Sequence, residues 1–232
     1  MRVLLVAATQ QEVGLLISDF RLTVLRASPF SISELDVANI YSLTTHNLQL
    51  TTVITGVGMV ATGFSLGKHL AVNQYDLAIN LGIAGSFDRS IALGEVVEII
   101  EDSFSELGAE DGDAFLPIDQ LGFGESTFKA SSRLANFGNF NLKQTVAITV
   151  NTVHGNDKSI QYLTDRIQPQ LENMEGAAFF YACKQAGIPC LQIRAVSNYV
   201  EKRNRGNWQI GLAIKNLNTF AAELIRQLQV VS

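Results

Sequence analysis

The stretch Asn173-Met174-Glu175-Gly176-Ala177-Ala178 decides how the rest of the chain is organised. It sets a carboxylate at the start of an apolar run that continues through Phe179-Phe180-Tyr181, and this pattern predicts a helix that begins near Glu175. The first backbone N–H groups of a helix have no partners within it, so a helix start suits a polar ligand. Two interpretations are open here: Glu175 either complements the helix dipole only, or contacts a ligand.

A second stretch favours the ligand interpretation. The apolar strand that contains Arg194 breaks into the polar pair Ser197-Asn198 at its carboxyl end. Ligands collect at the carboxyl ends of strands in α/β sheets, so we expect this pair to lie near Glu175.

Two other strands end in residues that suit the same cleft. The apolar strand over residues 2–8 is followed by Glu12, and the strand over residues 76–84 runs into the small-residue turn at Gly85. Between them, Thr55-Gly56-Val57-Gly58 precedes a predicted helix that reaches about residue 72. Such glycines let backbone N–H groups approach a polar ligand, although a tight turn is their more common reason.

The remaining elements are predicted from hydrophobic periodicity and turn residues. Alternating runs between residues 22 and 55 indicate an antiparallel meander, and residues 105–127 read as a long irregular connection. Further strands are predicted over 94–104, 146–153 and 190–197, and further helices over 157–167, 175–186 and 207–229.

Composition limits the classes of function. The 232 residues are 47% hydrophobic with a mean hydropathy of +0.18, enough for a large core, and one domain over residues 1–232 is the simplest organisation. The chain has 17 Lys and Arg against 22 Asp and Glu, a net charge of −5, and its one basic run is Lys202-Arg203-Asn204-Arg205. We therefore expect no nucleic-acid partner.

The apolar segments indicate neither a membrane span nor a secreted protein. No apolar run reaches the length of about 18 residues that a membrane helix needs, and the apolar start is too short for a signal peptide. We expect no membrane partner and a cytoplasmic location. Cys183 and Cys190 lie in apolar segments without metal-ligand spacing, so we expect reduced core residues, and we expect no metal and no cofactor.

Five motifs in fixed order carry a resemblance that spans the chain. They are Gln10-Gln11-Glu12-Val13, Thr55-Gly56-Val57-Gly58, Gly82-Ile83-Ala84-Gly85, Asn173-Met174-Glu175-Gly176-Ala177-Ala178 and Arg194-Ala195-Val196-Ser197-Asn198. Together they resemble the nucleoside phosphorylase/nucleosidase superfamily, in particular its methylthioadenosine/S-adenosylhomocysteine nucleosidase branch. Within it, Thr149-Val150-Asn151-Thr152-Val153 and Ser197-Asn198-Tyr199-Val200-Glu201 are most similar to the futalosine hydrolase family.

The resemblance implies both a fold and an activity. The fold is α/β: a three-layer α/β/α arrangement with a mixed central sheet of the nucleoside phosphorylase/hydrolase type. The activity is cleavage of a purine N-glycosidic bond, with a small-molecule purine nucleoside and water as reactants, as a step of menaquinone biosynthesis. A homodimer or a higher homo-oligomer is also implied.

The resemblance also implies roles at the sugar. Glu175 would accept hydrogen bonds from the ribose hydroxyls, and Met174 would pack against the sugar. Glu12 would act as the general base that takes a proton from the attacking water, and Arg194 would help to place that water. Each of the last three has an alternative explanation. Met174 could be a core methionine, Glu12 an acid in the first turn of a helix, and Arg194 a buried ion-pair partner.

Asn198 departs from the nucleosidase branch, which has aspartate here. Its amide can donate to O6 of a purine and accept from a protonated N7, a pattern that fits hypoxanthine or guanine. A carboxylate facing O6 would leave two acceptors unpaired, at a cost of about 1–3 kcal/mol. The alternative is a strand-end Asn that caps a turn. An amide is no strong acid, and the sequence identifies no proton donor for N7.

The attacking group is expected to be water. Phosphorylases of the superfamily hold phosphate with arginines near the first turn and near the glycine-rich turn, and the only arginine near either turn here is Arg89. Ile83 stands where a hydroxyl residue is usual, which removes a side-chain contact that the nucleosidases use.

Other candidates concern the base and the distal end of the substrate. Val153 stands where relatives stack an aromatic residue on the base, and His154 is expected at the surface, a pocket donor being the alternative. Arg203, Arg205 and Trp208 are candidates for the apolar, cationic pocket that the aromatic carboxylate of futalosine requires, although a solvated basic turn explains the arginines equally. In all, Glu12 and Asn198 are the candidate catalytic residues. The candidate substrate-binding residues are Glu175, Met174, Arg194, Gly85, Ile83, Val153, Asn173, Arg203, Arg205 and Trp208.

Three functional hypotheses follow. The first is hydrolysis of futalosine to hypoxanthine and dehypoxanthine futalosine. The second is a phosphorylase or hydrolase of another purine nucleoside, such as inosine or methylthioadenosine. The third is a nucleoside-binding protein without catalysis, against which the presence of both Glu12 and Glu175 argues, because binding needs no general base.

Overall fold

The computed structural model describes residues 1–24 and 40–231. Its centre is a mixed sheet with the strand order β11-β10-β6-β12-β5-β1-β4-β3-β2, and a further strand, β9, pairs with β6. The strands of this sheet are β1 (Arg2–Ala7), β2 (Thr23–Val24), β3 (Ile40–Thr44), β4 (Gln49–Ile54), β5 (Leu77–Ser86), β6 (Val96–Phe104), β9 (Thr127–Lys129), β10 (Lys143–Thr149), β11 (Leu171–Asn173) and β12 (Cys190–Tyr199). The α-helices are α1 (Gln10–Asp19), α2 (Met59–Leu70), α3 (Asp157–Arg166), α4 (Gly176–Ala186) and α5 (Ile210–Val231).

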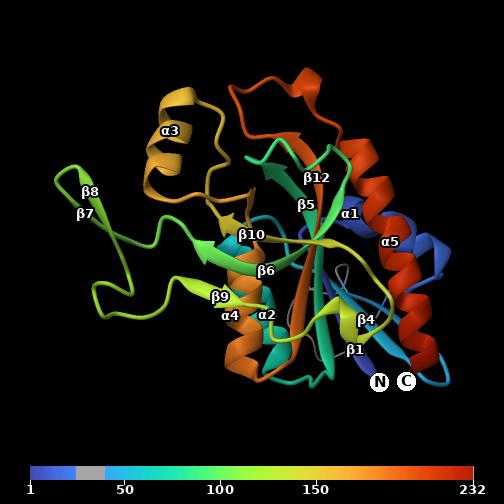
Figure 1. The fold of residues 1–232 in the computed structure, drawn as a ribbon. Helices are drawn as coiled ribbons and strands as arrows, with labels where there is room; N and C mark the ends of the chain where they lie inside the picture. The colour runs from blue at the N-terminus through green and yellow to red at the C-terminus, as the bar shows by residue number, and fades with distance from the viewer. Residues whose placement is uncertain (25–39, 232) are drawn as a thin grey trace.

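The layers follow from the way β1 alternates between two cores. A strand points successive side chains to opposite faces of the sheet. Val3 and Leu5 pack with residues of α1 and α5 on one face, whereas Leu4 and Val6 belong to the core that contains residues of α2 and α4. Figure 1 shows the two pairs of helices on opposite sides of the strands. The predicted three-layer α/β/α arrangement with a mixed central sheet is confirmed.

Part of the sheet closes into a ring. The short strand β11 pairs in parallel with β10 and antiparallel with β5, so that β5, β12, β6, β10 and β11 join edge to edge. The sequence analysis did not predict β11. Its pairing matters for the site because it sets Glu172 directly opposite Gly85 of β5.

Two other predictions need correction. Residues 105–127 are not wholly irregular, because they contain the hairpin of β7 (Gly108–Asp111) and β8 (Ala114–Pro117), visible at the left of Figure 1. The strand predicted over 146–153 runs from Lys143 to Thr149, so residues 150–153 lie beyond its end. The predicted meander is present as β2, β3 and β4, although parts of its runs lie outside the described residues.

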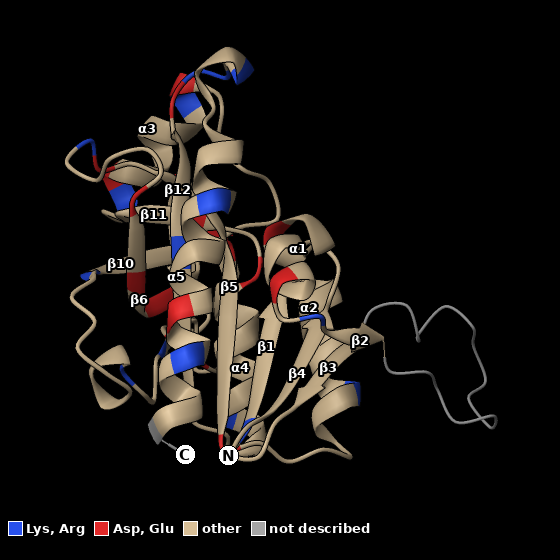
Figure 2. Ribbon diagram, turned by 90° about the vertical axis from the view of Figure 1, so that its right-hand side faces the viewer, with Lys and Arg blue, Asp and Glu red and all other residues tan. Residues whose placement is uncertain are grey.

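The charged residues of α5 are distributed along the helix. In the view of Figure 2, the basic residues on α5 form no continuous band, and Arg226 pairs with Glu223 on that helix at 3.6 Å. Over the described ranges, no helix has the length and apolar character needed to cross a membrane. Cys183 and Cys190 are buried and free, as predicted.

Candidate active site

One cavity, of about 300 Å³, opens at the carboxyl ends of β1, β5 and β12. This size is at the lower end of typical small-molecule sites. It brings together Glu12, Glu175 and Asn198, which come from three distant parts of the chain. The other described residues that line it are Ala8, Thr9, Gln11, Val57, Ile83, Ala84, Gly85, Val153, His154, Glu172, Asn173, Met174, Ser197, Trp208, Ile210 and Ile214.

Glu12 is fixed in the cavity wall by backbone N–H groups. The N–H of Thr9 donates to one carboxylate oxygen at 2.9 Å, and the N–H of Ile83 donates to the other at 3.2 Å. The carboxylate fits because residue 82 is glycine, where a Cβ would lie 3.0 Å from Oε1. Burial raises the pKa of the Glu12 carboxyl above its ordinary value, the charge of Glu175 raises it further, and Arg194 opposes the rise.

Glu175 occupies the N-cap position of α4, and its side chain is held by the glycine turn that precedes α2. The backbone N–H of Gly58 donates to Oε1 of Glu175 at 3.0 Å. Gly58 has a φ of 97°, a conformation that favours glycine. The Thr55-Gly56-Val57-Gly58 turn therefore does present an N–H to an anion, but the anion is a side chain of the protein itself.

Arg194 lies behind the cavity and does not line it. Its side chain is 1% exposed, and its Nη2 donates to Oδ1 of Asn80 at 2.5 Å and to Oδ1 of Asn173 at 3.3 Å. Burial lowers the pKa of the guanidinium, while nearby acids raise it, Glu175 most. The group is thus a buried positive charge next to the two carboxylates of the cavity.

A buried acid that the sequence analysis did not anticipate supports this arrangement. Asp102 is fully buried and accepts from Nδ2 of Asn173 at 2.7 Å, from Nε2 of Gln192 at 2.9 Å and from Oγ1 of Thr149 at 2.8 Å. Burial raises the pKa of its carboxyl. Asn173 in turn accepts from the N–H of Glu175 at 3.0 Å, so Asp102 holds the start of α4 in place.

Asn198 reaches the cavity through an irregularity in β12. The pairing of β12 with β5 shifts register between Val196 and Asn198, and this shift turns the strand end towards the site. The Oγ of Ser197 donates to Oδ1 of Asn198 at 2.8 Å, and Nδ2 of Asn198 donates to the carbonyl of Tyr199 at 3.0 Å. One amide hydrogen of Asn198 is left for a ligand.

His154 was expected at the surface, and this expectation is wrong. It lines the cavity, its side chain is 13% exposed, and its Nδ1 lies 2.7 Å from Oε2 of Glu172. The hydrogen bond with Glu172 raises the pKa of the imidazole. Glu172 also lines the cavity and was not predicted at all. A lone His and a lone Glu have no spacing that signals a pair, so only the tertiary fold reveals them.

The candidates at the cavity mouth divide into two groups. Trp208 and Val153 line the cavity. Arg203 and Arg205 are exposed and lie outside its wall, with their guanidinium carbons 4.8 Å and 5.9 Å from the centre of the Trp208 ring. Met174 and Ile83 line the cavity near the acids.

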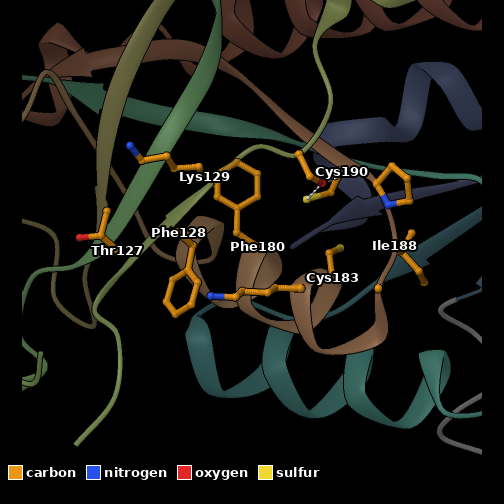
Figure 3. A pocket seen from close by; sticks show the side chains of 11 residues that line it. Thr127, Phe128, Lys129, Phe180, Cys183, Ile188 and Cys190 are labelled. Carbon is orange, nitrogen blue, oxygen red and sulfur yellow. Dashed lines mark hydrogen bonds between the residues drawn. The ribbon is translucent and has the colours of Figure 1, made fainter. Parts of the chain in front are cut away.

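A larger cavity of about 560 Å³ lies elsewhere, beside Cys183 and Cys190 (Figure 3). None of the described residues that line it is a carboxylate or a histidine. Its Lys129 pairs with Glu101, 3.2 Å away, and its Lys184 pairs with Glu125. It therefore lacks the paired carboxylates that the smaller cavity gathers, and size alone does not make it the reactive site.

Comparisons with known proteins show similarity along most of the chain. A family model described as the phosphorylase superfamily matches residues 2–229. Futalosine hydrolase from Thermus thermophilus is 31% identical over 181 residues, which cover 75% of this chain and 80% of that protein. The futalosine hydrolase structure from Helicobacter pylori has a TM-score of 0.78 at 15% identity, covering 98% of this chain and 97% of that one. The 5′-methylthioadenosine/S-adenosylhomocysteine nucleosidase from the same organism has a TM-score of 0.80 at 14% identity, covering 98% of both chains.

Proposed function

The chain belongs to the phosphorylase superfamily, and we propose that it hydrolyses the N-glycosidic bond of futalosine to release hypoxanthine and dehypoxanthine futalosine, a step of menaquinone biosynthesis. The observation that carries the proposal is the cavity that gathers Glu12, Glu175 and Asn198. A sequence identity of 31% to a futalosine hydrolase, over most of both chains, supports the substrate.

Glu175 stabilises the sugar as the bond breaks. Cleavage of a ribose–purine bond builds positive charge on C1′ and the ring oxygen, and a fixed carboxylate nearby favours that charge. One oxygen of Glu175 is held by the N–H of Gly58, which leaves acceptor positions for ribose hydroxyls. Met174, beside it in the cavity wall, packs against the sugar.

Glu12 removes a proton from the water that attacks C1′. A general base works best with a pKa near the working pH, and burial together with the charge of Glu175 moves the pKa of Glu12 upwards. The N–H groups of Thr9 and Ile83 keep the carboxylate oriented. Arg194, buried behind the cavity, offsets the repulsion between the two acids.

Water is the attacking group because the cavity is poorly suited to phosphate. Binding a dianion requires cationic side chains, usually arginines. Of the described residues that line the cavity, none is Lys or Arg. Arg194 is buried and engaged by Asn80 and Asn173, so its guanidinium is committed to the protein.

Asn198 binds the purine, and Trp208 forms the first part of the pocket wall that receives the distal carboxylate. The free amide hydrogen of Asn198 donates to O6 of hypoxanthine. At the mouth, the Trp208 ring offers an apolar surface, and Arg203 stacked on that ring supplies the positive charge.

A second copy of the chain covers an apolar face beside the cavity. Val60 and Phe64 on α2 are 79% and 73% exposed, and Val57, which lines the cavity, is 55% exposed. Phe123 and Tyr181 are 80% and 47% exposed, and both line a hollow beside Val60. Contiguous exposed apolar residues mark interaction surfaces, and continuity with the cavity favours a homo-oligomer in which the partner completes the site.

Product analysis tests the proposed activity. Futalosine, inosine and methylthioadenosine are each incubated with the protein, with and without phosphate, and the products are separated by chromatography. The proposal predicts hypoxanthine from futalosine in phosphate-free buffer and no stimulation by phosphate. Cleavage of methylthioadenosine alone, or a requirement for phosphate, would contradict it.

A further inference from the structure

The chemistry described so far leaves Glu172 without a role, although this acid lines the same cavity as Asn198. The sheet places both next to one residue. Gly85 on β5 is the register partner of Glu172 on β11 and also of Asn198 on β12. The two polar side chains therefore lie on either side of a single glycine, and the closure of the ring by β11 is what brings Glu172 there.

The absence of a side chain at residue 85 lets the two groups converge. A Cβ built on Gly85 would lie 3.0 Å from Cγ2 of Val200, 3.2 Å from Nδ2 of Asn198 and 3.4 Å from Cγ of Glu172. The side chains of Asn198 and Glu172 therefore both pack against the backbone of Gly85. Because both residues line the cavity, a base bound there would meet an amide and a carboxylate on neighbouring parts of the wall.

Glu172 is held rigidly but retains capacity for another hydrogen bond. The backbone N–H of His154 lies 3.1 Å and 3.3 Å from its two oxygens, and Nδ1 of His154 lies 2.7 Å from Oε2. An ionised carboxylate offers about four acceptor positions, so these contacts leave at least one. With its side chain only 2% exposed, Glu172 has few orientations available.

We propose that Glu172 accepts the N1–H of a 6-oxopurine while Asn198 donates to O6, so that the pair determines the class of base. This inference rests on the proposed function and deepens it. A 6-oxopurine presents an acceptor at O6 beside a donor at N1, which is complementary to an amide beside a carboxylate. Guanine adds a 2-amino donor next to N1–H, and the same carboxylate accepts it.

Adenine has the reverse pattern and is rejected. Its N1 is an acceptor, and opposite Glu172 two buried acceptors would face each other without a proton between them. A site that hydrogen-bonds a polar group discriminates strongly against analogues that leave its own groups unpaired.

The carboxylate of Glu172 also affects the leaving base. A base that leaves as an anion would be repelled by a carboxylate with no positive group beside it. His154, whose pKa is raised by Glu172, shares its proton with that acid and offsets the repulsion.

The first test uses the wild-type protein and three free bases, hypoxanthine, 1-methylhypoxanthine and adenine, with affinities measured by titration calorimetry. Methylation removes the N1 proton, so 1-methylhypoxanthine and adenine should each bind at least about tenfold more weakly than hypoxanthine. Equal binding of hypoxanthine and 1-methylhypoxanthine overturns the proposal. This arm needs no variant and therefore no assumption about folding.

The second test compares Glu172→Gln with Glu223→Gln, an exposed carboxylate on α5 that serves as the matched control. The glutamine amide can donate to N1 of adenine, so Glu172→Gln should narrow the preference for hypoxanthine over adenine by about tenfold or more. Glu223→Gln should leave the preference unchanged. An unchanged preference in Glu172→Gln, with an unfolding transition like that of wild type, overturns the proposal.

Futalosine cleavage by the same wild-type preparation separates the two possible failures. If futalosine is cleaved but 1-methylhypoxanthine binds as well as hypoxanthine, only the role of Glu172 is wrong. If futalosine is not cleaved, the proposed function is wrong, and the inference that rests on it falls too.

Discussion

Among single residues, the two acids of the proposed reaction, Glu12 and Glu175, are each held in a fixed orientation by backbone N–H donors. Glu12 is held by Thr9 and Ile83, and Glu175 is held by Gly58. Fixed carboxylates need no reorganisation when positive charge develops on a substrate, which is the main electrostatic advantage of an enzyme site.

Replacing Glu12 by Gln tests its role as the general base. Glutamine keeps the size but takes up no proton, so kcat for futalosine should fall by about 100-fold to 10,000-fold. Its single carbonyl oxygen can accept from only one of the N–H groups of Thr9 and Ile83, which the two oxygens of Glu12 accept separately. Substrate binding should change little, because the sugar contacts of Glu175 remain. Steady-state kinetics and equilibrium binding measure the two effects, and Glu223→Gln serves as the control. Retained turnover would remove Glu12 from this role.

The pH dependence of kcat/KM should report the raised pKa of Glu12. A general base acts only when deprotonated, so activity should fall as the pH decreases through the pKa of this carboxyl. Burial and the charge of Glu175 raise that pKa above the ordinary value of 4.5, so the fall should begin at a higher pH than an exposed Glu would give. Glu175→Gln removes one cause of the raised pKa of Glu12, so the loss of activity on the acid side should move to a lower pH. Full activity maintained down to the ordinary pKa of glutamate would contradict this account.

The sequence predicts that Glu12, Glu175 and Asn198 share one cleft, because each lies at the end of a clearly apolar strand or at the start of a clearly apolar helix. Sequence reasoning missed Asp102 and Glu172 and misplaced His154 for a common reason. None of these three residues belongs to a periodic pattern in the sequence, and the partner of each is set by tertiary pairing. The carboxylate of Asp102, for example, meets Gln192 and Asn173 across strands that are far apart in the sequence.

At the scale of elements, the strands and helices with long apolar patterns were predictable, and the short ones were not. β1, β5 and β12 are mainly apolar runs buried by helices on both faces, and α5 is amphipathic over its length. β9 and β11 have three residues each, too few for a period to be recognised. The hairpin of β7 and β8 has mostly exposed or half-buried residues, so its pattern resembles a loop.

The start of α4 depends on close packing at Gly176. A Cβ there would collide with Oδ2 of Asp102 and with the amide of Gln192, neither of which can move freely in the core. Gly176→Ala should therefore lower the free energy of unfolding by about 1–3 kcal/mol. The matched control is Gly67→Ala in α2, where an added Cβ meets nothing within 4 Å. This control should raise stability by about 0.5–1 kcal/mol. Urea denaturation measures both, and equal effects of the two changes would contradict this account.

At the scale of the whole molecule, an exposed apolar face and the cavity meet at Val57, which belongs to both. This continuity would link the proposed assembly to activity. If a second copy covers the face, it also closes one side of the site.

The assembly can be tested with a charged substitution on this face. Phe64→Glu should convert the proposed homo-oligomer to a monomer and weaken binding of futalosine, because desolvating a charge in an apolar interface is costly. Sedimentation velocity and steady-state kinetics measure the two effects. Val230→Glu, at an 81% exposed position near the end of α5, is the control and should change neither. A wild-type protein that sediments as a monomer would contradict the proposed assembly.

In the proposed reaction one cavity activates water against C1′ of futalosine, and the fate of the water oxygen reveals whether this happens. The reaction is run without phosphate in water enriched in heavy oxygen, and the dehypoxanthine product is analysed by mass spectrometry. We predict that the sugar product carries one heavy oxygen and that hypoxanthine is released in equal amount. Absence of cleavage, or a sugar product without the label, would contradict the account.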